Sequence, residues 1–249
     1  MTSTSSTQHT SVPAPRGVPK RLLDAIEHAT GVLYELVEEL DQTTVRGPSL
    51  LPGWTRAHVI THLARNADAL VNLLTWARTG VEHQAYASRA DRDADIEEGA
   101  GRLMQLLRAD LDSACTRFIR ACRDLPHSAW QAEVATPGGQ PIKADGVPWL
   151  RLRELWIHMV DLNHGITFDD LPPEWVEEFV ADSIERFDGR GPSVTIEATL
   201  PGGRQRSWTL NGPASTSVIG SGADVLGWLT GRTDGAGLRG DVPDLPAWG

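Results

Sequence analysis

The strongest constraint on the fold is an apolar repeat of three or four positions, present in four long stretches of the chain. In residues 20–40 the repeat consists of Leu22, Ile26, Ala29, Leu33, Leu36 and Leu40. Similar repeats fall at residues 56–79, about 93–123 and about 148–164. This spacing places the apolar side chains on one face of an α-helix. Four helices that must each bury one face predict a four-helix bundle, which we assign to residues 20–168.

The pattern changes after Gly165. The segment LPPEWVEEFVADSIERF predicts a fifth helix, and SVTIEATL, RSWTL and STSVIG are short β-type runs separated by Gly-rich turns. SGADVLGWLTGR returns to a helical pattern, and the last 15 residues look irregular. We therefore predict a small α+β domain over residues 169–249, which makes the whole chain α+β. Residues 1–19, rich in Ser, Thr and Pro, predict a disordered lead-in.

Charge and composition exclude several classes of function. The formal net charge of −10 and the absence of a Lys/Arg cluster argue against nucleic-acid binding. No apolar run approaches the roughly 18 residues of a membrane-spanning helix, and the N-terminal residues contain no apolar stretch typical of a secretory signal. We expect a cytoplasmic protein without a membrane or nucleic-acid partner. The oligomeric state stays open, a monomer included.

Two cysteines, Cys115 and Cys122, are expected on one predicted helix. Seven residues of helix separate their Cα atoms by roughly 10 Å, which is too far for a disulfide. We expect both to be reduced core residues, in agreement with a cytoplasmic location.

A candidate metal site is indicated by Glu154 and His158, which are four residues apart in RLRELWIHMVDLNHG. Four residues make about one helical turn, so both side chains leave the same face. The second predicted helix offers a third ligand, either His58 or His62, and the greater depth of His62 in that helix favours it. A His₂Glu centre keeps coordination positions open for water or substrate and is therefore suited to catalysis. The plain alternative is a surface contact between Glu154 and His158.

Two segments together resemble the mycothiol-dependent maleylpyruvate isomerases of the DinB-like metalloprotein superfamily. They are SLLPGWTRAHVITHLARNADAL and RLRELWIHMVDL. The likeness also includes the loop and helix after WARTG and the tail LTGR…G…VPDLPAW, so that it spans roughly residues 20–249. The resemblance implies a DinB-like bundle that carries the metal site.

The resemblance also implies specific roles for residues of this chain. His62, rather than His58, would join Glu154 and His158 in holding a divalent metal, normally zinc. Histidine and carboxylate ligands accept manganese, nickel or iron as well. Arg232, in LTGRTDG, matches an arginine implicated in activity in the family.

The activity implied is a cis–trans isomerisation of maleylpyruvate to fumarylpyruvate, in the gentisate pathway of aromatic degradation. Mycothiol would serve as thiol cofactor: its thiolate would add to the cis double bond, the resulting single bond would rotate, and elimination would return the thiol. The substrate is a dicarboxylate, so an acidic chain needs local positive charge to bind it. Arg232 is either a carboxylate-binding residue, through paired hydrogen bonds, or a solvated loop cation. The further candidates for anion contacts, Arg65, Arg151 and Arg153, are each expected to be solvated.

Three other functions remain compatible with the same residues. A mycothiol S-transferase would use the same metal and thiol on other electrophiles. A non-catalytic binding protein could retain the bundle, and a metal-dependent hydrolase could use an activated water.

Overall fold

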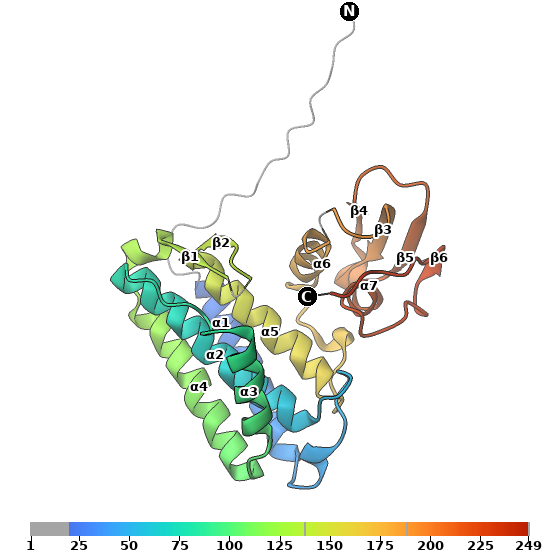
Figure 1. Ribbon diagram of the computed structural model, residues 1–249. Coiled ribbons are helices and arrows are strands. Elements are labelled where there is room, and N and C mark those ends of the chain that lie inside the picture. Colours follow the sequence, from blue (N-terminus) through green and yellow to red (C-terminus); the bar gives the residue numbers. More distant parts are fainter. Residues whose placement is uncertain (1–19, 137, 188, 249) are drawn as a thin grey trace, which may run out of the picture.

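The computed structural model describes residues 20–136, 138–187 and 189–248, and the predicted lead-in, residues 1–19, lies outside them. Figure 1 shows a part made of long helices and, beside it, a smaller part that contains a four-stranded sheet. The predicted α+β fold is confirmed.

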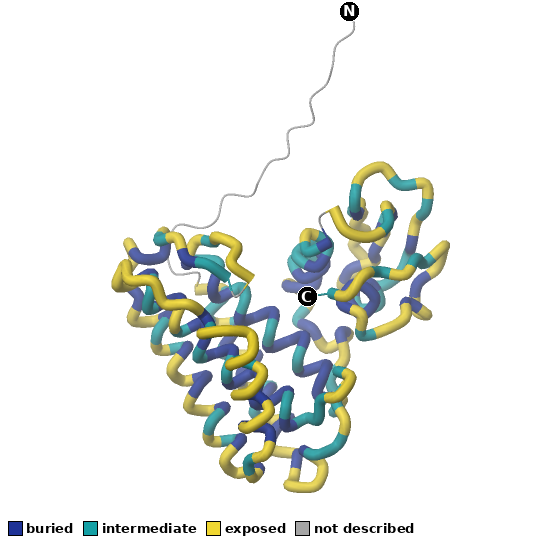
Figure 2. The backbone as a smooth tube through the Cα atoms, in the orientation of Figure 1, coloured by how far each residue is buried: buried dark blue, intermediate teal, exposed yellow. Residues whose placement is uncertain are grey.

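The long helices of the first part are α1 (Lys20–Glu39), α2 (Arg56–Thr79), α4 (Met104–Asp124) and α5 (Val147–Asp161). Helix α2 packs against α4 and α5, and α1 packs against α5. The predicted apolar stripes lie almost entirely at these contacts, as the dark blue inner faces of the helices in Figure 2 show. In α2, for example, the buried side chains of the stripe are Ile60, Leu63, Ala67, Leu70 and Leu74.

The single helix predicted over residues 93–123 is wrong. The structure has two helices there, α3 (Arg89–Ala100) and α4, and the loop 80–92 is shorter than expected. At the break, Gly99 lies in the last turn of α3 and Gly101 directly follows the helix, and glycine is a poor helix former. The guanidinium of Arg46 binds the carbonyl groups that the break exposes, and Leu103, assigned to the apolar stripe, is exposed.

Close packing of α3 on α2 depends on Gly99. A Cβ atom at this position would lie 2.4 Å from Cγ2 of Thr61, the residue before His62. The missing side chain therefore lets α3 approach the segment of α2 that carries the predicted metal ligand.

The second part holds a sheet in the order β4-β3-β5-β6. Its strands are β3 (Val194–Thr199), β4 (Gln205–Leu210), β5 (Ser217–Ser221) and β6 (Arg239–Gly240). Strand β3 is antiparallel to β4 and parallel to β5, and β5 is antiparallel to β6. Helices α6 (Val176–Glu185) and α7 (Gly222–Leu229) pack on each other and against the sheet, above the alternately buried residues of β3. The sequence patterns predicted every one of these elements except β6.

Two further features bear on the predictions. A hairpin of β1 (Glu133–Ala135) and β2 (Pro141–Lys143) surrounds the predicted interruption at 137–141. The boundary predicted between residues 168 and 169 falls in the connection from α5 to α6 and stays a prediction. Within the described residues, no helix combines the length and the apolar character needed to cross a membrane.

Candidate metal centre

His62, Glu154 and His158 converge on one point between α2 and α5. His62 Nε2 lies 3.0 Å from Glu154 Oε2 and 3.0 Å from His158 Nε2, and His158 Nε2 lies 3.4 Å from the same Glu154 oxygen. The helical spacing of Glu154 and His158 explains why both leave α5 on one face. The structure therefore brings together the three residues that the sequence suggested.

The start of α2 is aligned with the end of α5 by Arg56. Its Nε donates to the carbonyl of Leu162 at 2.7 Å, and its Nη2 donates to the carbonyl of Asn163 at 2.9 Å. These bonds satisfy carbonyl groups beyond the last turn of α5. They also fix the level at which His62 faces His158.

His58 takes a different role from His62, although it lies only one turn earlier. Its Nδ1 accepts a hydrogen bond from the backbone N–H of Thr55 at 3.1 Å, which caps the N-terminus of α2. Its Nε2 lies 3.2 Å from Glu97 Oε2. Both ring nitrogens of His58 are therefore engaged away from Glu154.

The distances within the triad fit a bound metal ion. In a tetrahedral site with bonds of 2.0–2.1 Å, neighbouring ligand atoms lie about 3.3 Å apart. The three distances of 3.0, 3.0 and 3.4 Å are close to that separation. Two imidazole nitrogens and a carboxylate oxygen also match the donors preferred by zinc and related divalent ions.

Burial and hydrogen bonding shift the pKa values of all three side chains. Burial alone would lower the pKa of His158, but hydrogen bonds to Asp161 and Glu154 raise it above its ordinary value. Burial, with the neighbouring His158, lowers the pKa of His62 to about 4, so this ring is neutral and able to bind a metal at neutral pH. Burial alone would raise the pKa of Glu154, but hydrogen bonds to the two histidines outweigh it and hold the pKa well below its ordinary value.

Asp161 supports His158 from behind. His158 Nδ1 lies 2.7 Å from Asp161 Oδ2, and the Asp161 side chain is fully buried. A carboxylate at this distance accepts the Nδ1 proton, which leaves the lone pair on Nε2 free for a metal. Asp161 was not among the residues predicted for the site, although its position three residues after His158 on one helix was a usable signal.

Arg232 reaches the same carboxylate from the second part of the molecule. Its Nε donates to Asp161 Oδ1 at 2.9 Å and its Nη2 donates to Asp161 Oδ2 at 2.7 Å. The side chain is buried, in contrast to a solvated loop cation. Arg232 is thus connected to the triad through Asp161, and its role in substrate binding stays a prediction.

Arg92, on α3, approaches the triad from the other side. Its Nη2 lies 3.3 Å from His62 Nδ1, and its guanidinium carbon lies 6.0 Å from the centre of the Tyr86 ring. A guanidinium only donates hydrogen bonds, so this contact requires an unprotonated Nδ1. A metal on Nε2 would place the ring proton on Nδ1 and release Arg92. No motif in the sequence pointed to this residue.

The expectation of solvated side chains is wrong for Arg151 and Arg153. Arg151 is 1% exposed and donates to the carbonyl of Leu63 and to Asn66 Oδ1, both at 2.8 Å. It therefore joins α5 to α2 inside the core. Arg153 is also buried and pairs with Asp182 of α6 at 3.2 Å. Arg65, which is partly exposed, pairs with Asp110 at 2.6 Å.

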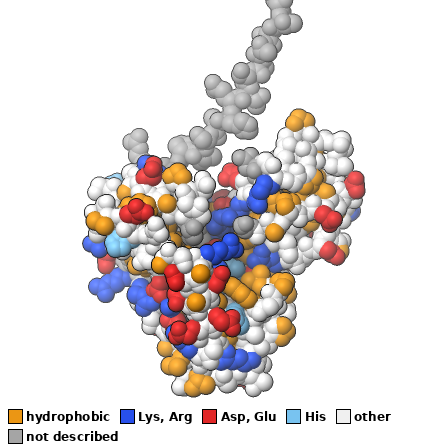
Figure 3. Space-filling model, viewed as in Figure 1, with side chains coloured by type: hydrophobic (Ala, Val, Ile, Leu, Met, Phe, Trp, Pro, Cys, Tyr) orange, Lys and Arg blue, Asp and Glu red, His pale blue; other side chains and the backbone are white. Residues whose placement is uncertain are grey.

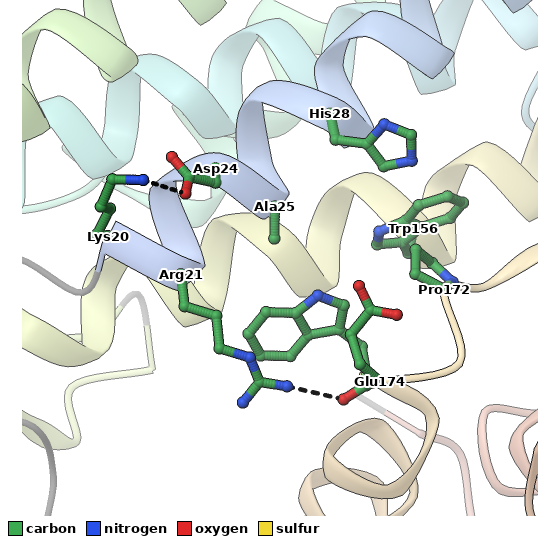
Figure 4. A pocket seen from close by; sticks show the side chains of 9 residues that line it. Lys20, Arg21, Asp24, Ala25, His28, Trp156, Pro172 and Glu174 are labelled. Carbon is green, nitrogen blue, oxygen red and sulfur yellow. Dashed lines mark hydrogen bonds and ion pairs between the residues drawn. The ribbon is translucent and has the colours of Figure 1, made fainter.

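A cavity of about 490 Å³ lies apart from the triad, where α1, α5 and the segment before α6 meet. In Figure 4, Lys20 pairs with Asp24, and Arg21 donates to the backbone carbonyl of Glu174. On the face seen in Figure 3, basic side chains gather in the hollow between the two parts of the molecule.

Comparison with known proteins gives the family. A family model described as "Mycothiol maleylpyruvate isomerase N-terminal domain" matches residues 26–163. The crystal structure of a mycothiol-dependent maleylpyruvate isomerase is similar, with 31% sequence identity, a TM-score of 0.84, and 92% of this chain and 96% of the other covered. A histidine-to-alanine mutant of a mycothiol-dependent maleylpyruvate isomerase matches at 30% identity with the same TM-score and coverage. No match was found among curated proteins. The family model and the two similar crystal structures together show that this chain belongs to the mycothiol-dependent maleylpyruvate isomerase family.

Proposed function

We propose that this protein is a metal- and mycothiol-dependent cis–trans isomerase that converts maleylpyruvate to fumarylpyruvate. The observation that carries the proposal is the convergence of His62, Glu154 and His158 within 3.4 Å of one another, in a member of this family. The two similar crystal structures are of enzymes named for this activity.

The three side chains would hold the metal, with zinc the expected ion. Three protein ligands leave at least one coordination position open. When bound, such an ion favours the deprotonated, nucleophilic form of a coordinated thiol. Cys115 and Cys122 are both buried, so neither is accessible as a nucleophile. The thiolate of mycothiol would take that role.

The reaction is a reversible thiol addition. A sulfur–carbon bond forms as the carbon–carbon π bond of the substrate breaks, and the electron pair moves into the adjacent carbonyl system. Rotation about the resulting single bond turns cis into trans. Expulsion of the thiolate restores the double bond, so the thiol is not consumed. The Trp54 ring lies beside His62, with 5.7 Å between the ring centres, and forms one apolar wall of the proposed site.

A comparison of two histidine variants tests the proposal. His62→Ala removes a proposed ligand, so we expect loss of bound zinc and of mycothiol-dependent turnover of maleylpyruvate, with an unchanged helical circular dichroism signal. His58→Ala is the matched control. His58 lies on the same helix, but its ring accepts a hydrogen bond from the backbone N–H of Thr55 at the helix N-terminus. Metal binding and activity should therefore persist in this variant, with a loss of about 1 kcal/mol in the free energy of unfolding.

The measurements are metal analysis and an absorbance assay for maleylpyruvate with and without mycothiol. Full zinc occupancy in His62→Ala would remove that residue from the site. Equal turnover without thiol would contradict the proposed reaction.

One observation favours a second function, transfer of mycothiol to other electrophiles. The paired donors of Arg232, expected to bind a substrate carboxylate, are engaged with Asp161. A transferase acting on uncharged electrophiles would not need that carboxylate contact. Parallel assays with maleylpyruvate and with monobromobimane decide between the two functions. An isomerase converts maleylpyruvate, whereas a general transferase consumes mycothiol with monobromobimane and does not convert maleylpyruvate.

A further inference from the structure

A continuous chain of hydrogen bonds runs from the second part of the molecule to the proposed metal centre. Arg232 donates two hydrogen bonds to the Asp161 carboxylate, at 2.9 and 2.7 Å, and Asp161 Oδ2 accepts from His158 Nδ1 at 2.7 Å. The opposite nitrogen of the same ring, His158 Nε2, faces His62 and Glu154. Asp161 therefore holds a metal-binding histidine on one side and a guanidinium on the other.

Burial makes this chain of contacts well defined. Asp161 is 0% exposed, and the Arg232 side chain is 9% exposed. Removing a charge from water is costly unless the charge is paired and hydrogen-bonded. The Asp161 carboxylate meets that condition through Arg232, a permanent cation, whereas its other partner, His158, would be a neutral ring if it held a metal.

The donors of Arg232 leave little capacity for a second carboxylate. Nε and Nη2, the two groups that form a fork, both face Asp161, and Nη1 donates to the carbonyl of Thr230 at 2.6 Å. The guanidinium carbon also lies 5.2 Å from the centre of the Trp248 ring. A bidentate contact with a substrate would require the buried pair with Asp161 to break.

We propose that Arg232 and Asp161 are positioning residues, through which the sheet-containing part fixes the orientation of His158 and so sets the metal affinity of the centre. Arg232 follows α7 in that part, whereas Asp161 is the last residue of α5. The helical part supplies all three ligands, and the second part holds one of them in place. This inference rests on the proposed metal centre but not on the identity of the substrate.

The proposal predicts a loss of metal affinity without any substrate present. Removal of a partner that orients a metal-binding histidine weakens binding by about 10- to 100-fold. We expect a weakening of this size for Arg232→Ala and for Asp161→Asn, measured by zinc titration against a chromophoric chelator. Arg232→Lys keeps the charge but not the planar fork, so its affinity should lie between those of Arg232→Ala and the wild type.

A matched control is available in the helical part. Arg117 binds Asp68 through the same two donor nitrogens, with Nε at 2.9 Å and Nη2 at 2.6 Å from Oδ1, but this pair is more exposed and is not hydrogen-bonded to the triad. Asp68→Asn should weaken this arginine–aspartate pair and leave the zinc affinity unchanged. Cobalt substitution adds a second readout, because the visible spectrum of the ion reports its ligand geometry, which should change in the Arg232 and Asp161 variants but not in Asp68→Asn.

Each outcome decides a different point. Wild-type zinc affinity and cobalt spectrum in Arg232→Ala, together with a raised KM for maleylpyruvate, would overturn the inference and make Arg232 a substrate-binding residue. A lower melting temperature with unchanged affinity would also overturn it. Absence of metal binding by the wild type would refute the proposed function itself. If Arg232→Ala does not fold, the Arg232→Lys titration decides.

Discussion

At the scale of single residues, identical spacing leads to different chemistry. His58 and His62 each lie one turn from the other on α2, so helical geometry alone treats them alike. The backbone N–H of Thr55 donates a hydrogen bond to Nδ1 of His58, whereas His62, one turn further along the helix, contacts Glu154 across the interface between α2 and α5. The position of the helix start therefore selects the ligand. Residue spacing identified both His58 and His62 as possible ligands, but it could not predict the hydrogen bond at the helix start that distinguishes His58 from His62.

The two cysteines give a prediction at this scale. Cys115 and Cys122 are each 1% exposed, and burial raises the pKa of the Cys122 thiol to about 12. We expect neither thiol to react with Ellman's reagent at pH 8 in the folded protein, and both to react in urea. Rapid modification of the native protein would show that one of them is accessible and would reopen the question of a cysteine nucleophile.

At the scale of elements, close contact between α2 and α3 shapes one side of the centre. Gly99 of α3 faces Thr61 of α2, and Arg92 of α3 reaches His62. The sequence pattern predicted a single helix here because apolar spacing continues through the break. Local periodicity predicts which face of a helix is buried, but it takes no account of the glycines and the Arg46 hydrogen bonds at the end of α3. These contacts come from residues distant in the sequence.

Substitution of two helical glycines tests this packing. Gly99→Ala would place a methyl group 2.4 Å from Thr61 Cγ2. We expect a loss of about 1–3 kcal/mol in the free energy of unfolding, typical of an overpacked contact. Gly31→Ala in α1 is the control, because nothing lies within 4 Å of its added Cβ. It should stabilise the protein by about 0.5–1 kcal/mol.

Urea denaturation measures both changes. Adding Thr61→Ala to Gly99→Ala should recover part of the loss, because it removes the methyl group that the new side chain meets. Equal effects of the two glycine substitutions would refute the proposed close contact.

At the scale of the whole molecule, the centre is assembled from residues far apart in the sequence. His62 and Glu154 are separated by 92 residues, and Asp161 and Arg232 by 71. The sequence predicted most of the helices, three of the four sheet strands and the three candidate ligands, because helical faces and local motifs are short-range properties. It predicted the burial of neither Arg151 nor Arg153, since their partners lie on other elements. Long-range pairing of charged groups is the part that the local pattern leaves undetermined.

A metal shared between α2 and α5 should stabilise the entire fold. A ligand at 100 times its Kd adds about 2.7 kcal/mol, which for a protein of this size corresponds to a rise in Tm of about 5–10 °C. We expect EDTA to lower the Tm of the zinc-loaded protein by this amount and zinc to restore it. His62→Ala should melt at the same temperature with and without EDTA. Superimposable melting curves for the loaded and stripped wild type would contradict a metal held between the two helices.

The pairing of Arg232 with Asp161 has a consequence for biosynthesis. A nascent chain that has released Asp161 from the ribosome must grow by another 71 residues before Arg232 follows. An ion bound in that interval would contact His158 before Arg232 is available to bind Asp161. Maturation of the proposed centre would therefore wait for synthesis of the sheet-containing part, and a polypeptide stalled after α5 would release its ion more readily than one that extends past Arg232.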